Sequence, residues 1–106
     1  MKRFNLKDMT RGWFVGDFEP SAFKTENCEV SYRSYKSGDC EAKHYHKLAI
    51  ELTLITSGKV KMNGIEYREG DIVVIKPGEA TDFIALTDAT NVVVKVPSLK
   101  GDKYLC

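Results

Sequence analysis

Residues Gly38 to Gly58 read GDCEAKHYHKLAIELTLITSG, and this stretch holds both histidines of the chain. His44 and His46 are separated by one residue, so on a β-strand their side chains point to the same face. Glu51 follows His46 at an odd offset, which a single straight strand would send to the opposite face. We therefore expect the chain to bend or bulge after Lys47. With that bend, two imidazoles and one carboxylate share one side of the chain.

The composition is that of a single globular domain. The chain has 106 residues, of which 42% are hydrophobic and 29% are charged. A net charge of +1 provides no field that would attract nucleic acid or an anionic membrane, so neither is an expected partner. The sequence has no apolar run long enough to span a bilayer and no signal peptide. Because three cysteines are too few and odd in number for a disulfide framework, we expect a reduced, cytoplasmic protein.

From about residue 28 onward, short β-prone runs alternate with turn signals, a pattern typical of a β-sandwich or barrel. Asn63-Gly64 between two alternating segments predicts a two-residue hairpin turn. No window has a sustained helical period, so at most one helical turn is expected, near Lys7–Arg11. The fold class is therefore all-β. The strands that we expect are Cys28–Lys36, Lys43–Lys47, Ala49–Thr56, Lys59–Asn63, Ile65–Arg68, Asp71–Lys76, Thr81–Leu86 and Asn91–Val96.

The segment AIELTLIT, residues 49–56, has apolar side chains on both faces. Its two-residue period places Ile50, Leu52 and Leu54 on one face and Glu51 on the other. A closed or nearly closed barrel with Glu51 in the lumen explains why both faces are buried.

The outer apolar face then needs a cover, and two are available. One is the segment 1–27, and the other is a second subunit in a homodimer, which we expect. We accordingly divide the chain into an N-terminal segment, 1–27, that covers the barrel or the dimer interface, and a barrel domain, 28–106. The aromatic residues of the first segment that we expect to form this cover are Trp13, Phe14, Phe18 and Phe23.

The stretch from Gly38 to Gly58 resembles the first motif of the cupin superfamily, whose members are small β-barrels of the jelly-roll type. That motif is Gly, five residues, His-x-His, three or four residues, Glu, six residues and Gly. Every defined position is present, from Gly38 through His44, His46 and Glu51 to Gly58. The resemblance implies a single-domain jelly-roll barrel with these side chains in its lumen.

The second cupin motif is Gly, five residues, Pro-x-Gly, two residues, His, three residues and Asn. It begins here at Gly70 and keeps only its two glycines, Gly70 and Gly78. Thr81 stands where the family has the histidine that would be the fourth metal ligand. The hydroxyl of Thr81 can hold a water molecule there, and Glu79 on the adjoining loop can complete the shell.

Two imidazoles and one carboxylate form the ligand set used for divalent Zn, Ni, Mn or Fe, with positions left open for water or substrate. We therefore expect His44, His46 and Glu51 to hold one such ion. Two alternatives stay open: metal-free acid–base chemistry, or three lumen residues that only hydrogen-bond to one another and to water. Tyr32 or Tyr35 is expected to look into the barrel. We expect Tyr32, Thr81 and Glu79 to line the ligand pocket. For Tyr32 the alternative is that it only packs in the core.

The expected ligand is a small polar molecule. The segments GWFVGDFEP and NVVVKVPSLKGDKYLC are similar to short cupins found with enzymes of polysaccharide and nucleotide-sugar synthesis, which implies a sugar or nucleotide sugar. We therefore predict a metal-binding cupin-fold protein that acts on such a molecule by isomerisation or epimerisation. A non-catalytic metabolite-binding or regulatory module and a metal-free isomerase or epimerase are the alternatives.

Overall fold

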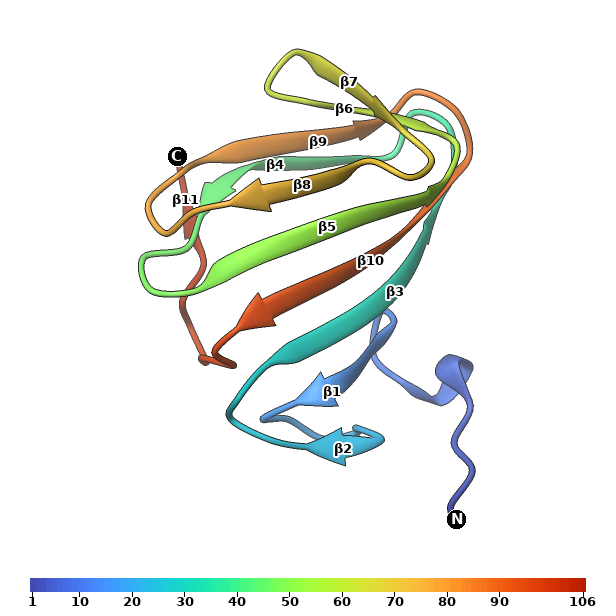
Figure 1. The fold of residues 1–106 in the computed structure, drawn as a ribbon, viewed down its shortest axis with the longest axis vertical. Coiled ribbons are helices and arrows are strands. Elements are labelled where there is room, and N and C mark those ends of the chain that lie inside the picture. The colour runs from blue at the N-terminus through green and yellow to red at the C-terminus, as the bar shows by residue number, and fades with distance from the viewer.

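Two β-sheets face each other across the interior of the protein, and the computed structural model describes residues 1–106 (Figure 1). The strands are β1 Trp13–Gly16, β2 Phe23–Lys24, β3 Glu29–Tyr35, β4 Cys40–Tyr45, β5 Ile50–Ser57, β6 Lys59–Met62, β7 Ile65–Arg68, β8 Ile72–Ile75, β9 Thr81–Ala85, β10 Ala89–Val96 and β11 Tyr104–Leu105. The six-stranded sheet has the order β2-β1-β3-β10-β5-β8, and the five-stranded sheet has the order β11-β4-β9-β6-β7.

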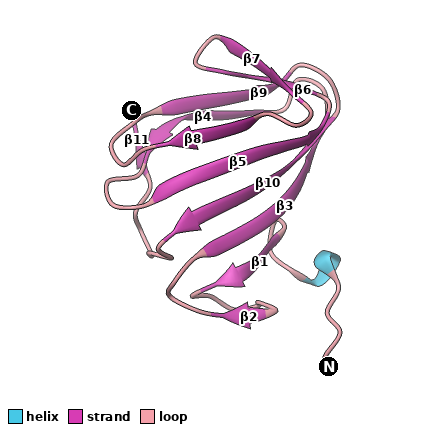
Figure 2. Cartoon of the chain, viewed as in Figure 1, coloured by secondary structure: helices cyan, strands magenta, loops and turns pink.

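Nearly all regular structure is strand, which confirms the all-β fold class (Figure 2). The helical element is one 3-10 turn, Leu6–Asp8, in the region where a single turn was predicted. Asn63 and Gly64 join β6 to β7 with φ of 50° and 79°, the positive values that a type I′ hairpin turn requires. The sequence did not predict β1, β2 and β11; β2 and β11 have only two residues each, which is too short to show alternation. No helix is both long enough and apolar enough to cross a bilayer.

The inner face of β5 changes from apolar to polar along the strand. Ile55 is fully buried in the hydrophobic core, whereas Thr53 and Glu51 line a cavity. Polar side chains therefore collect between the sheets at the start of β5, and the core fills the space at its end. The core cluster consists of Tyr35, Ile55, Val60, Met62, Ile75, Phe83, Ala85 and Ala89.

The N-terminal segment extends the six-stranded sheet beside β3 (Figure 1). β1 pairs antiparallel with β3, and β2 pairs parallel with β1. Trp13 and Phe18 line the cavity between the sheets, whereas Phe23 is 65% exposed. Trp13 and Phe18 thus contribute to the inner side of the fold, and Ile72 and Val74 on the outer face of β8 remain exposed.

Gly58 joins β5 to β6 with φ of 78°, and a β-carbon there would collide with the main chain of Asp88 and Ala89. Gly64 has nearly the same φ, 79°, with open space around it. We expect Gly58→Ala to lower the free energy of unfolding by about 3 kcal/mol or more, because the collision adds to the conformational cost. Gly64→Ala should cost only about 1 kcal/mol, from backbone conformation alone. Urea denaturation of both variants measures the difference, and equal losses would contradict the steric explanation.

Candidate functional site

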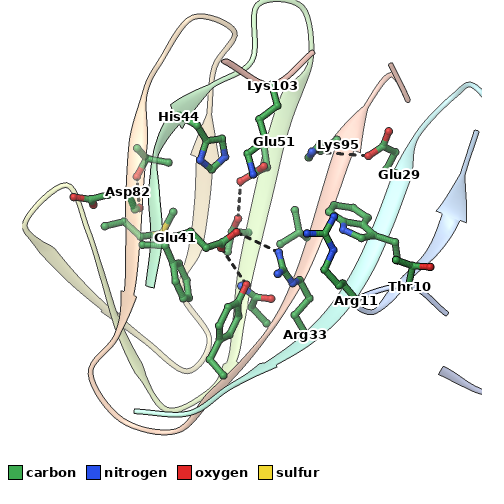
Figure 3. Close-up of a pocket in the computed structure, with 18 of the residues that line it drawn as sticks. Thr10, Arg11, Glu29, Arg33, Glu41, His44, Glu51, Asp82, Lys95 and Lys103 are labelled. Atoms are coloured by element: carbon green, nitrogen blue, oxygen red, sulfur yellow. Dashed lines mark hydrogen bonds and ion pairs between the residues drawn. The ribbon is translucent and has the colours of Figure 1, made fainter. Parts of the chain in front are cut away.

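A cavity of about 370 Å³ lies between the two sheets at the polar end of β5 (Figure 3). Its wall combines charged side chains, hydroxyl and amide groups, and the aromatic rings of Trp13 and Phe18. Such a mixture of donors, acceptors and apolar surface suits a small polar molecule. The charged and titratable residues of the wall are Arg11, Glu19, Glu29, Arg33, Glu41, His44, Glu51, Asp82, Lys95 and Lys103.

The two histidines lie at and just beyond the end of β4, with ring centroids 5.4 Å apart and ring planes at 82°. The Nδ1 atom of His44 contacts the carbonyl oxygen of Ala42 at 3.0 Å, and Nδ1 of His46 contacts the carbonyl oxygen of Asp102. Because a carbonyl oxygen can only accept a hydrogen bond, Nδ1 carries a proton in both rings. The other ring nitrogen, Nε2, is the one left to bind a proton or a metal ion, as is usual for metal-ligating histidines.

The Nε2 atom of His46 lies 3.5 Å from a carboxylate oxygen of Glu51 and has no hydrogen-bond partner. The two side chains are only 6% and 12% exposed. Burial raises the pKa of the Glu51 carboxyl, but His46 and Lys95 outweigh burial and hold the pKa below its ordinary value. A carboxylate facing the lone pair of a neutral imidazole is repulsive. A proton on Nε2, a metal ion, or a water molecule that donates to both groups would remove this repulsion.

The turn of residues 46–49, which brings His46 and Glu51 to the same side, is fixed by the C-terminal segment. The buried carboxylate of Asp102 accepts hydrogen bonds from the main-chain N–H groups of Lys47, Leu48 and Ala49 at 3.0, 3.2 and 3.0 Å. The carbonyl oxygen of the same residue accepts from His46. The predicted bend after Lys47 is present, and Asp102 stabilises it while orienting the histidine.

A second polar group of the wall is centred on Glu41 of β4 (Figure 3). Its carboxylate accepts hydrogen bonds from the Tyr35 hydroxyl at 3.2 Å and from the Arg33 guanidinium at 3.3 Å. Burial and the charge of Glu41 raise the pKa of Tyr35 well above its ordinary value. The hydroxyl therefore keeps its proton and acts as a donor. This network can orient hydroxyl groups of a ligand from the side of the cavity formed by β3 and β4.

Thr81 lies where the sequence predicted it, buried in the cavity wall and paired with His44 across β4 and β9. Its hydroxyl donates to the carbonyl oxygen of Asp82 at 2.8 Å. The structure contains no group of three His, Cys, Asp or Glu side chains placed to hold a metal ion. It thus brings His46 and Glu51 together and places His44 beside them, without a closed set of ligands.

Two residues of the predicted pocket lie outside it. Tyr32 is exposed on the outer face of β3, because the strand period turns Arg33 and Tyr35 into the cavity and Tyr32 away from it. Glu79 is exposed in the turn before β9, where its carboxylate accepts a hydrogen bond from the Lys76 N–H at 3.0 Å. Of the two tyrosines considered, Tyr35 is the one that faces the cavity.

Several solved structures share this architecture. A conserved protein with a double-stranded β-helix domain from Klebsiella pneumoniae matches with a TM-score of 0.70 and 25% identity, over 77% of this chain and 72% of that chain. A cupin-superfamily sugar phosphate isomerase from Silicibacter pomeroyi matches with a TM-score of 0.63 and 22% identity, over 68% and 52%. The protein has the cupin fold. KdgF from a Halomonas species matches this chain with a TM-score of 0.64 and 18% identity, over 71% and 74%. No protein-family model matches the chain, and no curated protein matches it either.

Sequence reasoning missed several residues of the cavity wall, for two reasons. Glu41 and His44 both face the cavity although they are three residues apart, because the pairing of β4 with β9 shifts register between them. Such a bulge has no sequence signature, and a strict two-residue period places Glu41 on the wrong face. Asn91 and Lys95 did carry a signal. They alternate with Val92 and its neighbours in NVVVKV, which marks a polar inner face on β10.

Proposed function

We propose that this cupin-fold protein binds one divalent metal ion through His44, His46 and Glu51 and takes a small polar, sugar-like molecule into the adjoining cavity. The observation that carries the proposal is the buried Nε2 atom of His46, which lacks a hydrogen-bond partner and faces the Glu51 carboxylate at 3.5 Å. A cation between these groups removes the repulsion that the neutral imidazole would feel. A set of two nitrogens and one carboxylate suits Zn, Ni, Mn or Fe.

The metal would act as a Lewis acid on an oxygen atom of the ligand. The chain's own residues would hold the ligand: the Tyr35 hydroxyl, whose proton is donated to Glu41, can accept a hydrogen bond, and the carboxylate of Glu41 and the hydroxyl of Thr81 are further polar groups of the wall. Ligation requires the three side chains to adjust, since they do not form a closed set in the structure. The similarity to a sugar phosphate isomerase supports, at the level of fold, isomerisation or epimerisation of a sugar as the reaction.

A second function is favoured by the same pair of side chains. If the cation between His46 and Glu51 is a proton, the pair is a hydrogen-bonded acid and base inside a ligand cavity. The protein would then be a metal-free isomerase or epimerase, or a binding module that senses a metabolite without converting it.

Metal content distinguishes these functions. We expect the purified protein, dialysed without chelator, to retain about one equivalent of a divalent metal by plasma mass spectrometry. The metal-free protein should take up Zn²⁺, Ni²⁺, Mn²⁺ or Fe²⁺ in titration calorimetry with one site per chain. A protein that is isolated without metal and binds none of the four ions would contradict metal binding and leave the proton as the cation.

We also propose that the protein forms a homodimer through the outer face of the six-stranded sheet. Two rows of apolar side chains cross β3, β10, β5 and β8 on this face, as the strand registers show. Ile72 and Val74 at the edge are 65% and 50% exposed. An uncovered apolar area of this kind favours association. The rows are Val30, Val94, Leu52, Val74 and Tyr32, Val92, Leu54, Ile72.

Light scattering coupled to gel filtration tests the dimer. We expect the wild type to elute with twice the mass of one chain and Ile72→Lys to elute as a monomer, because a buried unpaired lysine is unfavourable in such an interface. Ile65→Lys is the matched control, since Ile65 is 57% exposed but lies on β7 of the other sheet. A wild-type monomer, or equal behaviour of the two variants, would contradict this interface.

A further inference from the structure

Two basic groups of the cavity wall have no partner within the chain. Each carboxylate of the wall has a partner, whereas two of the four basic side chains, Arg11 and Lys103, form no ion pair. Arg33 is paired with Glu41, and Lys95 with Glu29. The partners of the carboxylates are Lys24 for Glu19, Lys95 and Ser98 for Glu29, Arg33 and Tyr35 for Glu41, His46 and Thr53 for Glu51, and the main chain of Asn63 for Asp82.

Arg11 is held over the cavity by a tight turn. Arg11 and Gly12 form a two-residue turn with φ of 50° and 83°, closed by the hydrogen bond from Trp13 N–H to the Thr10 carbonyl oxygen at 3.0 Å. A left-handed backbone is unfavourable for arginine, and asparagine or glycine would adopt it without strain. A strained residue of this kind at a cavity is the type of outlier from which a functional role is inferred.

The turn is also fixed against β3, next to the second arginine of the wall. The Gly12 carbonyl oxygen accepts a hydrogen bond from the Tyr32 N–H at 3.1 Å. A β-carbon on Gly12 would collide with the Tyr32 carbonyl oxygen and touch the side chain of Arg33. Figure 3 shows Arg11 and Arg33 reaching the cavity from these neighbouring elements. Arg33 has a carboxylate partner, whereas the exposed guanidinium of Arg11 has none and keeps its hydrogen-bond donors free for a ligand.

We propose that Arg11, together with the adjacent Arg33, forms a subsite for an oxyanion carried by the ligand, either a carboxylate or a phosphate group. The guanidinium plane matches both groups with two parallel hydrogen bonds. This inference rests on the proposed function only in its assumption that a small polar molecule enters the cavity, and it does not depend on the metal ion. It narrows the ligand from any sugar-like molecule to an acidic one.

Three probes that differ at a single carbon test the subsite: D-glucose, D-glucuronate and D-glucose 6-phosphate. We expect the Arg11 Nε–H signal in ¹⁵N-NMR spectra to shift with the two anionic sugars and to stay in place with glucose. The fitted affinity should be about tenfold or more higher for at least one anionic sugar than for glucose. Which of the two binds more tightly identifies the anion as carboxylate or phosphate. Equal affinity for all three, or no binding of any, would overturn the proposal.

The variant Arg11→Gly separates this role from a structural one. Glycine adopts the positive φ without strain, so we expect a melting temperature at least as high as that of the wild type. The preference for the anionic sugar should fall about tenfold, because the charged donors are lost. Arg3→Gly is the matched control, since it removes the same charge from an exposed residue outside the cavity. Arg11→Gly with an unchanged preference would overturn the subsite.

The experiment also separates failure of the subsite from failure of the proposed function. Glucose binding without discrimination in a protein that contains metal would remove the oxyanion subsite and leave the proposed function intact. An Arg11-dependent preference for the anionic sugars in a protein that binds no metal would support the oxyanion subsite and contradict the metal-binding function.

Discussion

Asp102→Ala is expected to lower the free energy of unfolding by about 3 to 5 kcal/mol, a large part of the roughly 5 to 15 kcal/mol that stabilises a domain of this size. The substitution leaves the N–H groups of Lys47, Leu48 and Ala49 without their acceptor. The hydrogen bond of Ala49 is buried and the other two are partly buried, and donors that lose their partner in such surroundings cost more than an ordinary exposed hydrogen bond. The turn that carries His46 would lose its shape at the same time. Urea denaturation followed by circular dichroism measures the loss.

The free energy of unfolding measured at acidic pH gives a second test of the role of Asp102. Burial raises the pKa of the Asp102 carboxyl, but the three N–H donors outweigh burial and hold the pKa below the ordinary value of 3.8. A pKa that is lower in the folded state stabilises the fold above the ordinary value, and this contribution is lost as the pH falls through the folded value. Asp102→Asn keeps the size of the side chain without the charge. The difference in stability between wild type and Asp102→Asn should therefore shrink below about pH 4. A difference that is constant with pH would show that the charge is irrelevant.

The sequence predicted those parts of the site that depend on local pattern. His44 and Glu51 line the cavity, Glu51 because the apolar stripe of β5 is on the other side, whereas His46 lies just beyond β4 and faces Glu51 from outside the cavity wall. The motif spacing then placed these strands in a cupin barrel, which the similar solved structures bear out. Local pattern also located the hairpin at Asn63-Gly64.

The parts that were not predicted depend on interactions between distant segments. Asp102 lies in an irregular stretch near the C-terminus, and its carboxylate is recognisable as a cap only once that stretch is seen against the turn at 46–49. Glu41 enters the cavity through a register shift against β9, which is set by the sheet as a whole. Arg11 reaches the cavity because its turn is hydrogen-bonded to β3. In each case the residue's own neighbourhood in sequence is uninformative, and the tertiary contact decides its position.

The choice between Tyr32 and Tyr35 is a different kind of failure. Both tyrosines lie on one strand, and they are an odd number of residues apart, so only one can face inward. The sequence shows that alternate residues of this strand lie on opposite faces, but it does not show which set faces inward. Tyr32 and Val30 are as apolar as an inner face would be. The structure uses that apolar row on the outer face instead, next to Val92 on β10. The phase of β3 is thus a consequence of the uncovered outer face, which the sequence alone does not reveal as such.

Glu51→Gln is expected to lower the affinity for the divalent metal by more than about 100-fold. Loss of a residue that merely supports a ligand costs about 10- to 100-fold, and loss of a direct ligand should exceed that range. The substitution preserves size and leaves an amide oxygen, so the fold should persist. Titration calorimetry on the metal-free protein measures the affinity. Melting temperature gives a second readout, because a metal bound only by the folded state raises it, and the rise grows with the logarithm of the affinity.

Glu79→Gln is the matched control for this variant. The change in charge is the same, and Glu79 is the carboxylate that sequence reasoning placed near the metal but that the structure places in an exposed turn. We expect metal affinity and metal-induced stabilisation to remain at the wild-type level in Glu79→Gln. His46→Ala should match Glu51→Gln, since the two side chains face each other across the same 3.5 Å gap. If Glu51→Gln bound metal as tightly as Glu79→Gln, the cation between His46 and Glu51 would be a proton, and the site would work by acid–base chemistry.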